Sequence, residues 1–183
     1  MRNWQHCSSM TRTAVLAQRR LRMPMKTDSD YLQRCVELAL QSVEAGGGPF
    51  AAILVQDGQI IAESCNEVVQ TLDPTAHAEV QTIRKASQAL QQPHFPHATL
   101  YSSCEPCPMC LAAIHWAHIP RIRFAASHHE AARGGFADTP IALKLYGQPR
   151  PVNISSDTLQ QVEIAGASKP FDAWLALADR FEY

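Results

Sequence analysis

The chain has 183 residues, 46% of them hydrophobic, which fits one domain with a well-filled core. Its formal net charge of −1 is unevenly spread: the first 26 residues carry six Lys and Arg and no acid, so the rest holds ten Lys and Arg against seventeen Asp and Glu. An acidic body offers no cluster of cations for a phosphate backbone, which argues against a nucleic-acid partner.

The basic opening segment contains no continuous apolar run of signal-peptide length. No other stretch approaches the roughly 20 apolar residues of a membrane span. We therefore predict a flexible basic tail at 1–27 and one domain at 28–183, located in the cytoplasm and without a membrane partner. In a reducing compartment, the six cysteines are better explained as metal ligands than as disulfides.

The first predicted elements after the tail are a helix and a hairpin. Apolar residues at helical spacing predict a helix that is capped by Ser29 or Asp30 and stopped by Gly46. Two apolar runs within 49–66 are joined by Asp-Gly at 57–58, the strongest short-range signal for a β-hairpin.

The next elements alternate between helix and strand. A second helix is expected to begin almost at His77, followed by a strand in "ATLYSS", a helix in "PCPMCLAAIHWAHIP" and a strand in "RIRFAA". Residues 128–168 show a weak pattern, which predicts loop with one helical turn and a late strand in "LQQVEIAG". The C-terminal segment predicts an amphipathic helix whose stripe comprises Phe171, Trp174, Leu175, Ala178 and Phe181. This order implies an α/β fold with a mixed sheet covered by helices.

Two short motifs carry the chemistry. "HAE" at 77–79 and "PCPMC" at 106–110 match the H-x-E and P-C-x-x-C signature of zinc deaminases. Each motif is predicted at the start of a helix, and Cys107 and Cys110 share one face of the first turn. The positive end of a helix dipole also favours thiolates, the form that binds metal.

The role of a third cysteine decides whether the site is closed or open. Cys104 lies before Pro106 at a strand end, so we assign it to packing or to support of the ligands. His77, Cys107 and Cys110 then supply three zinc ligands and leave the fourth position for water. Glu79 is in place to act as general base beside that water.

Three alternative roles for the cysteines remain open. A structural Cys3His zinc site uses the same ligands but leaves Glu79 without a role. An iron–sulfur cluster would need a fourth cysteine near Ala113 or Ile114, where there is none. A redox CxxC pair would not explain His77.

With these residues in hand, the chain resembles the bacterial guanine deaminases of the cytidine/deoxycytidylate deaminase superfamily. The resemblance runs from about residue 30 to the C-terminus and rests on "GGPFAAILVQDGQIIAE", "DPTAHAEV", "LYSSCEPCPMCLAAIHWA", "GFADT" and the closing "EY". It implies a three-layer α/β/α sandwich on a mixed five-stranded sheet, one Zn²⁺ per chain, and a homodimer in which the C-terminal segment can contribute to the partner's site.

The resemblance also implies roles for individual residues. Glu79 would shuttle protons, and the zinc ligands would be His77, Cys107 and Cys110. The residues that would contact a purine base are Phe50, Asn66, Ala78, Trp116, Asp138 and Tyr183. "GFADT" departs from two consecutive acids in the family by having Ala137, so Asp138 is the only candidate there.

The implied reaction is hydrolytic deamination of guanine to xanthine and ammonia, with zinc-bound hydroxide as nucleophile. Alternatives are a tRNA adenosine deaminase, a deaminase of another nucleobase or of a triazine such as ammeline, and a non-catalytic zinc-binding module. The C-terminus "FDAWLALADRFEY" is apolar and acidic, which argues against tRNA. The histidines outside the motif, His128 among them, show no ligand spacing with an acid partner, and we expect them to be solvated or packed.

Overall fold

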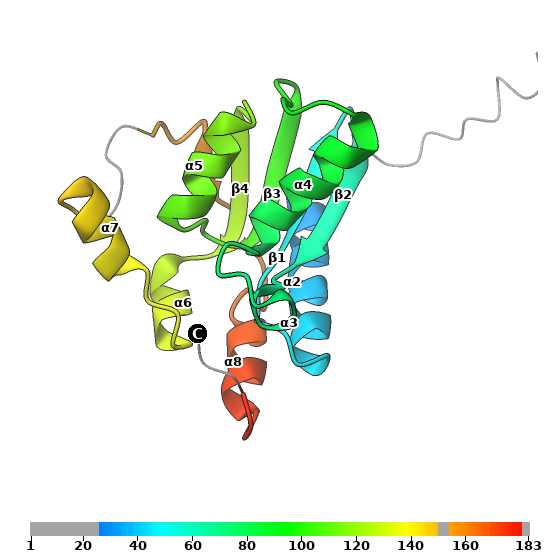
Figure 1. Ribbon diagram of the computed structural model, residues 1–183. Coiled ribbons are helices and arrows are strands. Elements are labelled where there is room, and N and C mark those ends of the chain that lie inside the picture. The colour runs from blue at the N-terminus through cyan, green and yellow to red at the C-terminus, as the bar shows by residue number, and fades with distance from the viewer. Residues whose placement is uncertain (1–25, 150–153, 181–183) are drawn as a thin grey trace, which may run out of the picture.

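One mixed sheet organises the molecule. In the computed structural model, residues 26–149 and 154–180 are described (Figure 1), so most of the predicted tail lies outside the described residues. The sheet has the strand order β2-β1-β3-β4-β5, and β1 is antiparallel to both neighbours, whereas β3, β4 and β5 run parallel. The strands are β1 Ala51–Gln56, β2 Gln59–Cys65, β3 Ala98–Cys104, β4 Arg121–Ala126 and β5 Leu159–Gln161.

Helices cover both faces of this sheet. Figure 1 shows α4 and α5 in front of the strands and α2 behind them. The helices are α2 Asp28–Glu44, α3 Val68–Thr71, α4 Ala78–Leu90, α5 Pro108–Trp116, α6 His128–Arg133, α7 Thr139–Tyr146 and α8 Lys169–Ala176. None of the helices within the described ranges is long and apolar enough to cross a bilayer.

The alternation of side chains along the central strands produces two apolar cores. Leu54, Leu100 and Ile122 lie side by side across β1, β3 and β4, and they pack in one cluster under α4 and α5. Ile53 and Tyr101 project from the opposite face into a cluster with α2. Because successive residues of a strand point to opposite faces, one sheet supports both helical layers. The predicted α/β/α sandwich on a mixed five-stranded sheet is confirmed.

The first helix differs from the prediction in its cap. Thr27, rather than Ser29 or Asp30, is the N-cap, and Asp30 returns a hydrogen bond to the Thr27 backbone in a capping box. The predicted hairpin is confirmed: Asp57 has φ 52° and Gly58 has φ 74°. Two positive φ values suit the tight turn that matches the twist of paired strands.

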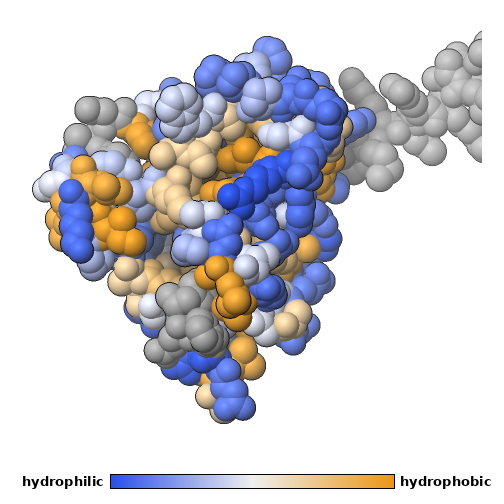
Figure 2. All heavy atoms as spheres, viewed as in Figure 1, coloured by the Kyte–Doolittle hydropathy of each residue, from blue (hydrophilic) through white to orange (hydrophobic). Residues whose placement is uncertain are grey.

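The segment from 128 to 168 contains more structure than its pattern predicts. It forms α6 and α7, while the late strand shrinks to three residues. The sequence of α7 shows no amphipathic pattern. Its large apolar residues Ile141, Leu143 and Leu145 are all exposed, so they do not form a stripe that faces the core. Figure 2 shows apolar side chains gathered on the surface of α7.

The C-terminal helix is shorter than predicted. It ends at Ala176, which leaves Ala178 beyond the helix, and Phe181 lies outside the described residues. Phe171 and Trp174 are buried as expected, but Leu175 is 45% exposed and does not belong to the buried stripe.

Candidate active site

The two predicted motifs meet at the amino ends of two neighbouring helices. His77 is the N-cap of α4 and Cys107 is the N-cap of α5, with Pro108 at the first helical position. Proline is favoured there because its missing N–H would have no helical partner. Since α4 and α5 pack side by side on one face of the sheet, the two caps and Cys110 of the first turn converge.

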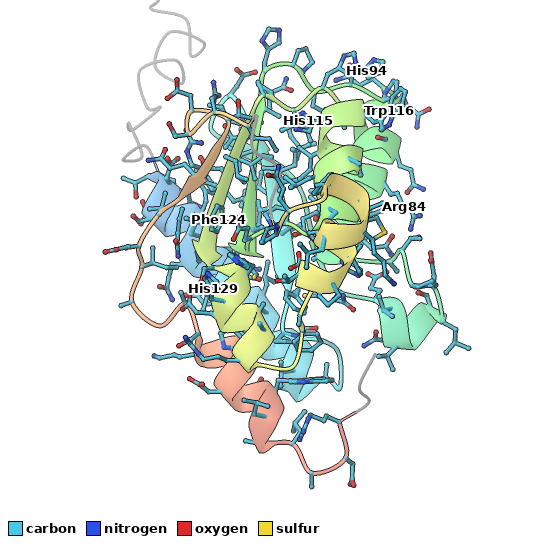
Figure 3. The ribbon with its side chains drawn as sticks, turned by 90° about the vertical axis from the view of Figure 1, so that its left-hand side faces the viewer. Arg84, His94, His115, Trp116, Phe124 and His129 are labelled. Atoms are coloured by element: carbon cyan, nitrogen blue, oxygen red, sulfur yellow. The ribbon has the colours of Figure 1, made fainter. Side chains whose placement is uncertain are left out.

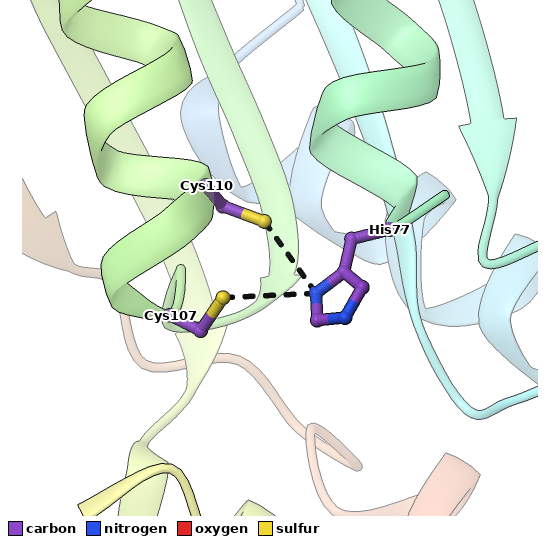
Figure 4. A group of neighbouring side chains, drawn as sticks. All are labelled: His77, Cys107 and Cys110. Atoms are coloured by element: carbon purple, nitrogen blue, oxygen red, sulfur yellow. Dashed lines mark hydrogen bonds between the residues drawn. The ribbon is translucent and has the colours of Figure 1, made fainter. Parts of the chain in front are cut away.

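The ligand atoms have the spacing of a tetrahedral zinc site. The Sγ atoms of Cys107 and Cys110 each lie 3.6 Å from Nδ1 of His77 (Figure 4). With Zn–S near 2.3 Å and Zn–N near 2.0 Å, a tetrahedron requires an S···N edge of about 3.6 Å. Within the described part of the chain these three residues form the one group of His, Cys and acidic side chains suited to a metal. The donor set therefore fits zinc and leaves one coordination position open.

Glu79 is buried beside the metal group. It lies in the first turn of α4 and is 6% exposed. The Ser102 hydroxyl donates to Oε1 at 3.1 Å, and the Cys110 thiol donates to Oε2 at 3.4 Å. These contacts hold the Glu79 carboxylate next to the metal ligand Cys110.

Burial and mutual hydrogen bonds shift the pKa values of this group. The hydrogen bond with Cys110 is the largest of the effects that lower the pKa of Cys107 to about 4, and His77 adds to it. Burial, and then the charge of Cys107, raise the pKa of Glu79. Burial alone would lower the pKa of His77, but the hydrogen bond and charge of Cys107 raise it overall. Because a bound metal replaces these protons, the shifts describe the apo-protein, in which Cys107 is already a thiolate.

Cys104 stands apart from the ligands. Its thiol is buried, contacts the carbonyl oxygen of Ser127 at 3.8 Å, and packs with Ala126 and Phe171. Burial raises the pKa of Cys104 well above its usual value, which keeps the thiol protonated. It is not a member of the metal group, as predicted.

A cavity of about 350 Å³ opens beside the metal group. Three residues predicted to contact a base, Phe50, Asn66 and Asp138, line it together with His77, Cys107 and Glu79. The rest of its wall comes from Val68, Pro74, Cys104, Glu105, His128, Ala131, Gly135, Phe136, Ala137 and Ile141. A cavity of this size, apolar with a few convergent polar groups, suits one small heterocycle.

Asn66 and Asp138, two polar residues of the cavity wall, have complementary hydrogen-bonding capacities. The backbone N–H of Val68 donates to Oδ1 of the buried Asn66 at 3.1 Å, which orients the amide so that its NH₂ group is the end that can donate to a ligand. Asp138, at the N-cap of α7, does not cap that helix with its side chain. Burial raises the pKa of Asp138, and the charge of Cys107 adds to this rise.

Three of the predicted base contacts are not on the cavity wall. Trp116 does not line the cavity of its own chain: it is 80% exposed and is the last residue of α5 (Figure 3), at the opposite end of that helix from Cys107. Ala78 is fully buried, and its side chain belongs to the core rather than to the cavity. Tyr183 lies outside the described residues.

Three residues of the cavity wall were missed in the sequence. The Phe136 ring meets Phe50 edge to face, with centroids 4.9 Å apart. Oε2 of Glu105 lies 3.0 Å from Nδ1 of His128, so His128 is packed, as one of the two expected outcomes, against an acid that its sequence spacing did not indicate. Sequence spacing could not reveal this pair, because its members lie on a loop and a helix that only the parallel pairing of β3 and β4 brings together.

Comparison with known proteins agrees with this geometry. The profile of the cytidine and deoxycytidylate deaminase zinc-binding region matches residues 25–126. The guanine deaminase of Bacillus subtilis is 45% identical over 154 residues, 84% of this chain and 97% of that protein. A tRNA-specific adenosine deaminase of Agrobacterium fabrum is 40% identical over 118 residues, 62% of this chain and 74% of that protein.

A solved structure extends the similarity to the fold. The crystal structure of guanine deaminase from Bacillus subtilis superposes with a TM-score of 0.65 at 43% identity, over 86% of this chain and 99% of that one. Since the profile matches more than half of the chain and the guanine deaminase matches 84% of it at 45% identity, the chain belongs to the cytidine and deoxycytidylate deaminase family of zinc-binding enzymes.

Proposed function

We propose that this enzyme hydrolyses guanine to xanthine and ammonia. The observation that carries the proposal is the 45% identity to a guanine deaminase over nearly the whole length of that relative. The similarity to the tRNA deaminase of Agrobacterium fabrum spans a smaller share of the chain. The cavity beside His77, Cys107 and Cys110 supports the proposal because it has room for a free base.

Each polar group of the site has a place in this reaction. His77, Cys107 and Cys110 would hold the zinc ion, which would supply a Lewis acid that brings the pKa of a water molecule toward neutrality. Glu79 accepts the proton that this water loses as its oxygen attacks the amine-bearing carbon of guanine. Glu79 delivers that proton to a ring nitrogen and then transfers the proton of the newly added hydroxyl group to the amino group, so that the carbonyl of xanthine forms as ammonia leaves.

The base itself can be recognised by the groups that line the cavity. The Asn66 amide offers N–H donors to an acceptor of the base, such as the guanine carbonyl. The Asp138 carboxylate offers acceptors to ring or exocyclic N–H groups. The Phe50 and Phe136 rings supply apolar surface for a flat heterocycle.

A substrate panel tests this function. We expect the zinc-loaded enzyme to deaminate guanine faster than adenine, cytosine, cytidine, ammeline or a tRNA anticodon stem-loop, followed by absorbance and ammonia release. Higher kcat/KM on the stem-loop would identify a tRNA deaminase, and higher kcat/KM on ammeline a triazine deaminase. Zinc binding without turnover of any compound would identify a non-catalytic zinc module.

We also propose that the enzyme is a cytoplasmic homodimer. The exposed apolar residues Trp116, Ile141, Leu143 and Leu145 support an interface between two copies, because large apolar side chains gain free energy when another chain covers them. The free cysteines of the described chain suit a reducing compartment.

The predicted role of Tyr183 leads to an expected result, although the residue lies outside the described range. Removing Glu182 and Tyr183 should lower kcat/KM for guanine at least about tenfold, or roughly 1.4 kcal/mol, because closure over the base fails. Folding and zinc content should survive, since Phe171 and Trp174 anchor α8 in the core. Steady-state kinetics and metal analysis check this; full-length rates in the truncated enzyme would contradict the role of Tyr183.

A further inference from the structure

Glu105 is a buried carboxylate next to the metal ligands whose role the proposed reaction leaves unexplained. Its side chain is 5% exposed, it lies two residues before Cys107, and it lines the cavity. A buried carboxylate is destabilising unless donors surround it. Oε2 accepts from the backbone N–H of His128 at 3.1 Å and lies 3.0 Å from Nδ1 of the same residue. Glu105 therefore contacts His128 through both the backbone and the ring of that residue.

His128 lies on the cavity wall, at the start of the segment that leads to Asp138. It is the first residue of α6, and its side chain is 14% exposed. Its ring lines the main cavity together with Asp138, and the same two residues also line a smaller neighbouring cavity. His128 thus lies beside Asp138 as well as beside Glu105.

The connection between His128 and Asp138 is short and internally bonded. The Ser127 hydroxyl and the Glu130 carboxylate form a capping box at the start of α6. The N–H of Phe136 donates to the carbonyl of Ala131 at 2.9 Å, after a turn in which Gly135 has φ 98°. A shift of α6 relative to the metal-ligand loop, which contains Glu105 and Cys107, would therefore also move Asp138.

We propose that the Glu105–His128 pair is a positioning device for base recognition, which holds α6 against the metal-ligand loop and so fixes Asp138 relative to His77, Cys107 and Cys110. The inference rests on the proposed function only in taking the cavity as the site where a base binds. Neither residue needs to exchange a proton in the reaction. The pair acts through Asp138: when Asp138 is displaced, its carboxylate no longer meets the N–H groups of the base, so binding of the base weakens.

Two amide variants of His128 separate this role from simple packing. In His128→Asn the side-chain NH₂ takes the approximate position of Nδ1 and can still donate to Glu105. In His128→Gln the amide reaches the position of the distal ring nitrogen, so the side-chain bond to Glu105 is lost while the bond from the backbone N–H is kept. Both variants are neutral, polar and smaller than or similar to histidine, so a purely structural role predicts similar effects for both.

The measurements are KM and kcat on the base that the wild-type enzyme turns over best, with zinc content and melting temperature of each preparation. We expect His128→Asn to keep KM within about threefold of wild type, and His128→Gln to raise KM at least about tenfold, because a displaced Asp138 loses its hydrogen bond to the base, a bond that involves a charged group. In both variants kcat should change less than KM, with one zinc retained per chain.

A double variant adds an independent check. Because the two residues are proposed to act as a unit, Glu105→Ala combined with His128→Gln should raise KM no more than the worse single variant. Equal KM values in His128→Asn and His128→Gln, additive effects in the double variant, or loss of zinc in parallel with activity would each overturn the proposal. The failure of the proposed function would be visible separately, as a wild-type enzyme that prefers a compound other than guanine.

Discussion

Replacing Glu79 with glutamine is expected to lower kcat for guanine by at least about 10³-fold, since general acid–base transfer contributes about 10² to 10⁴ and this residue serves twice. Glutamine has nearly the same shape and can still accept the hydrogen bond from Ser102. Zinc content should stay at one per chain, because Glu79 is not a member of the ligand group. Steady-state kinetics, metal analysis and the melting temperature of the variant measure these outcomes.

A matched control for that variant is Glu63→Gln. It makes the same chemical change at an ion pair with Arg34 in which both side chains are more than a third exposed. Such surface pairs contribute about 0 to 1 kcal/mol, so the activity of Glu63→Gln should equal that of wild type. Near-normal turnover by Glu79→Gln would refute the proposed proton transfers, whereas loss of zinc would assign Glu79 to the metal site.

Replacing Cys107 with serine is expected to empty the zinc site and abolish turnover. A hydroxyl is a far weaker zinc ligand than a thiolate, and Cys107 is the cysteine whose pKa falls to about 4. The remaining ligands, His77 and Cys110, cannot by themselves complete the three-ligand set of a catalytic zinc site. Metal analysis after dialysis should give close to one zinc per wild-type chain and almost none per variant chain.

Cys104→Ser is the matched control, because it makes the same atomic change a few residues away. The introduced hydroxyl can donate to the Ser127 carbonyl that the thiol already contacts. Zinc should therefore be retained, with a loss of stability of about 1 to 3 kcal/mol from placing a more polar group in the core. If Cys104→Ser also emptied the site, the ligand set would have to include Cys104.

The sequence alone was sufficient for the metal group and the central elements. His77, Cys107 and Cys110 could be assigned because each belongs to a local motif at a helix start, and helix caps depend on residues only a few positions apart. The Asp-Gly turn at 57–58 and the strands of the sheet core were predictable for the same reason, since turn chemistry and alternation are local.

The tertiary structure decided which side chains surround the metal group formed by His77, Cys107 and Cys110. Whether Trp116 faces the cavity depends on how α5 packs, and the packing leaves its ring exposed. Glu105 and His128 are 23 positions apart, and their contact exists only because β3 and β4 pair in parallel and end together beneath the cavity. α7 buries the small residue Ala142 and leaves its large apolar residues exposed, so no apolar period in the sequence predicted this helix. Contacts between distant segments follow from the packing of the whole chain, and one sequence contains no local signal for them.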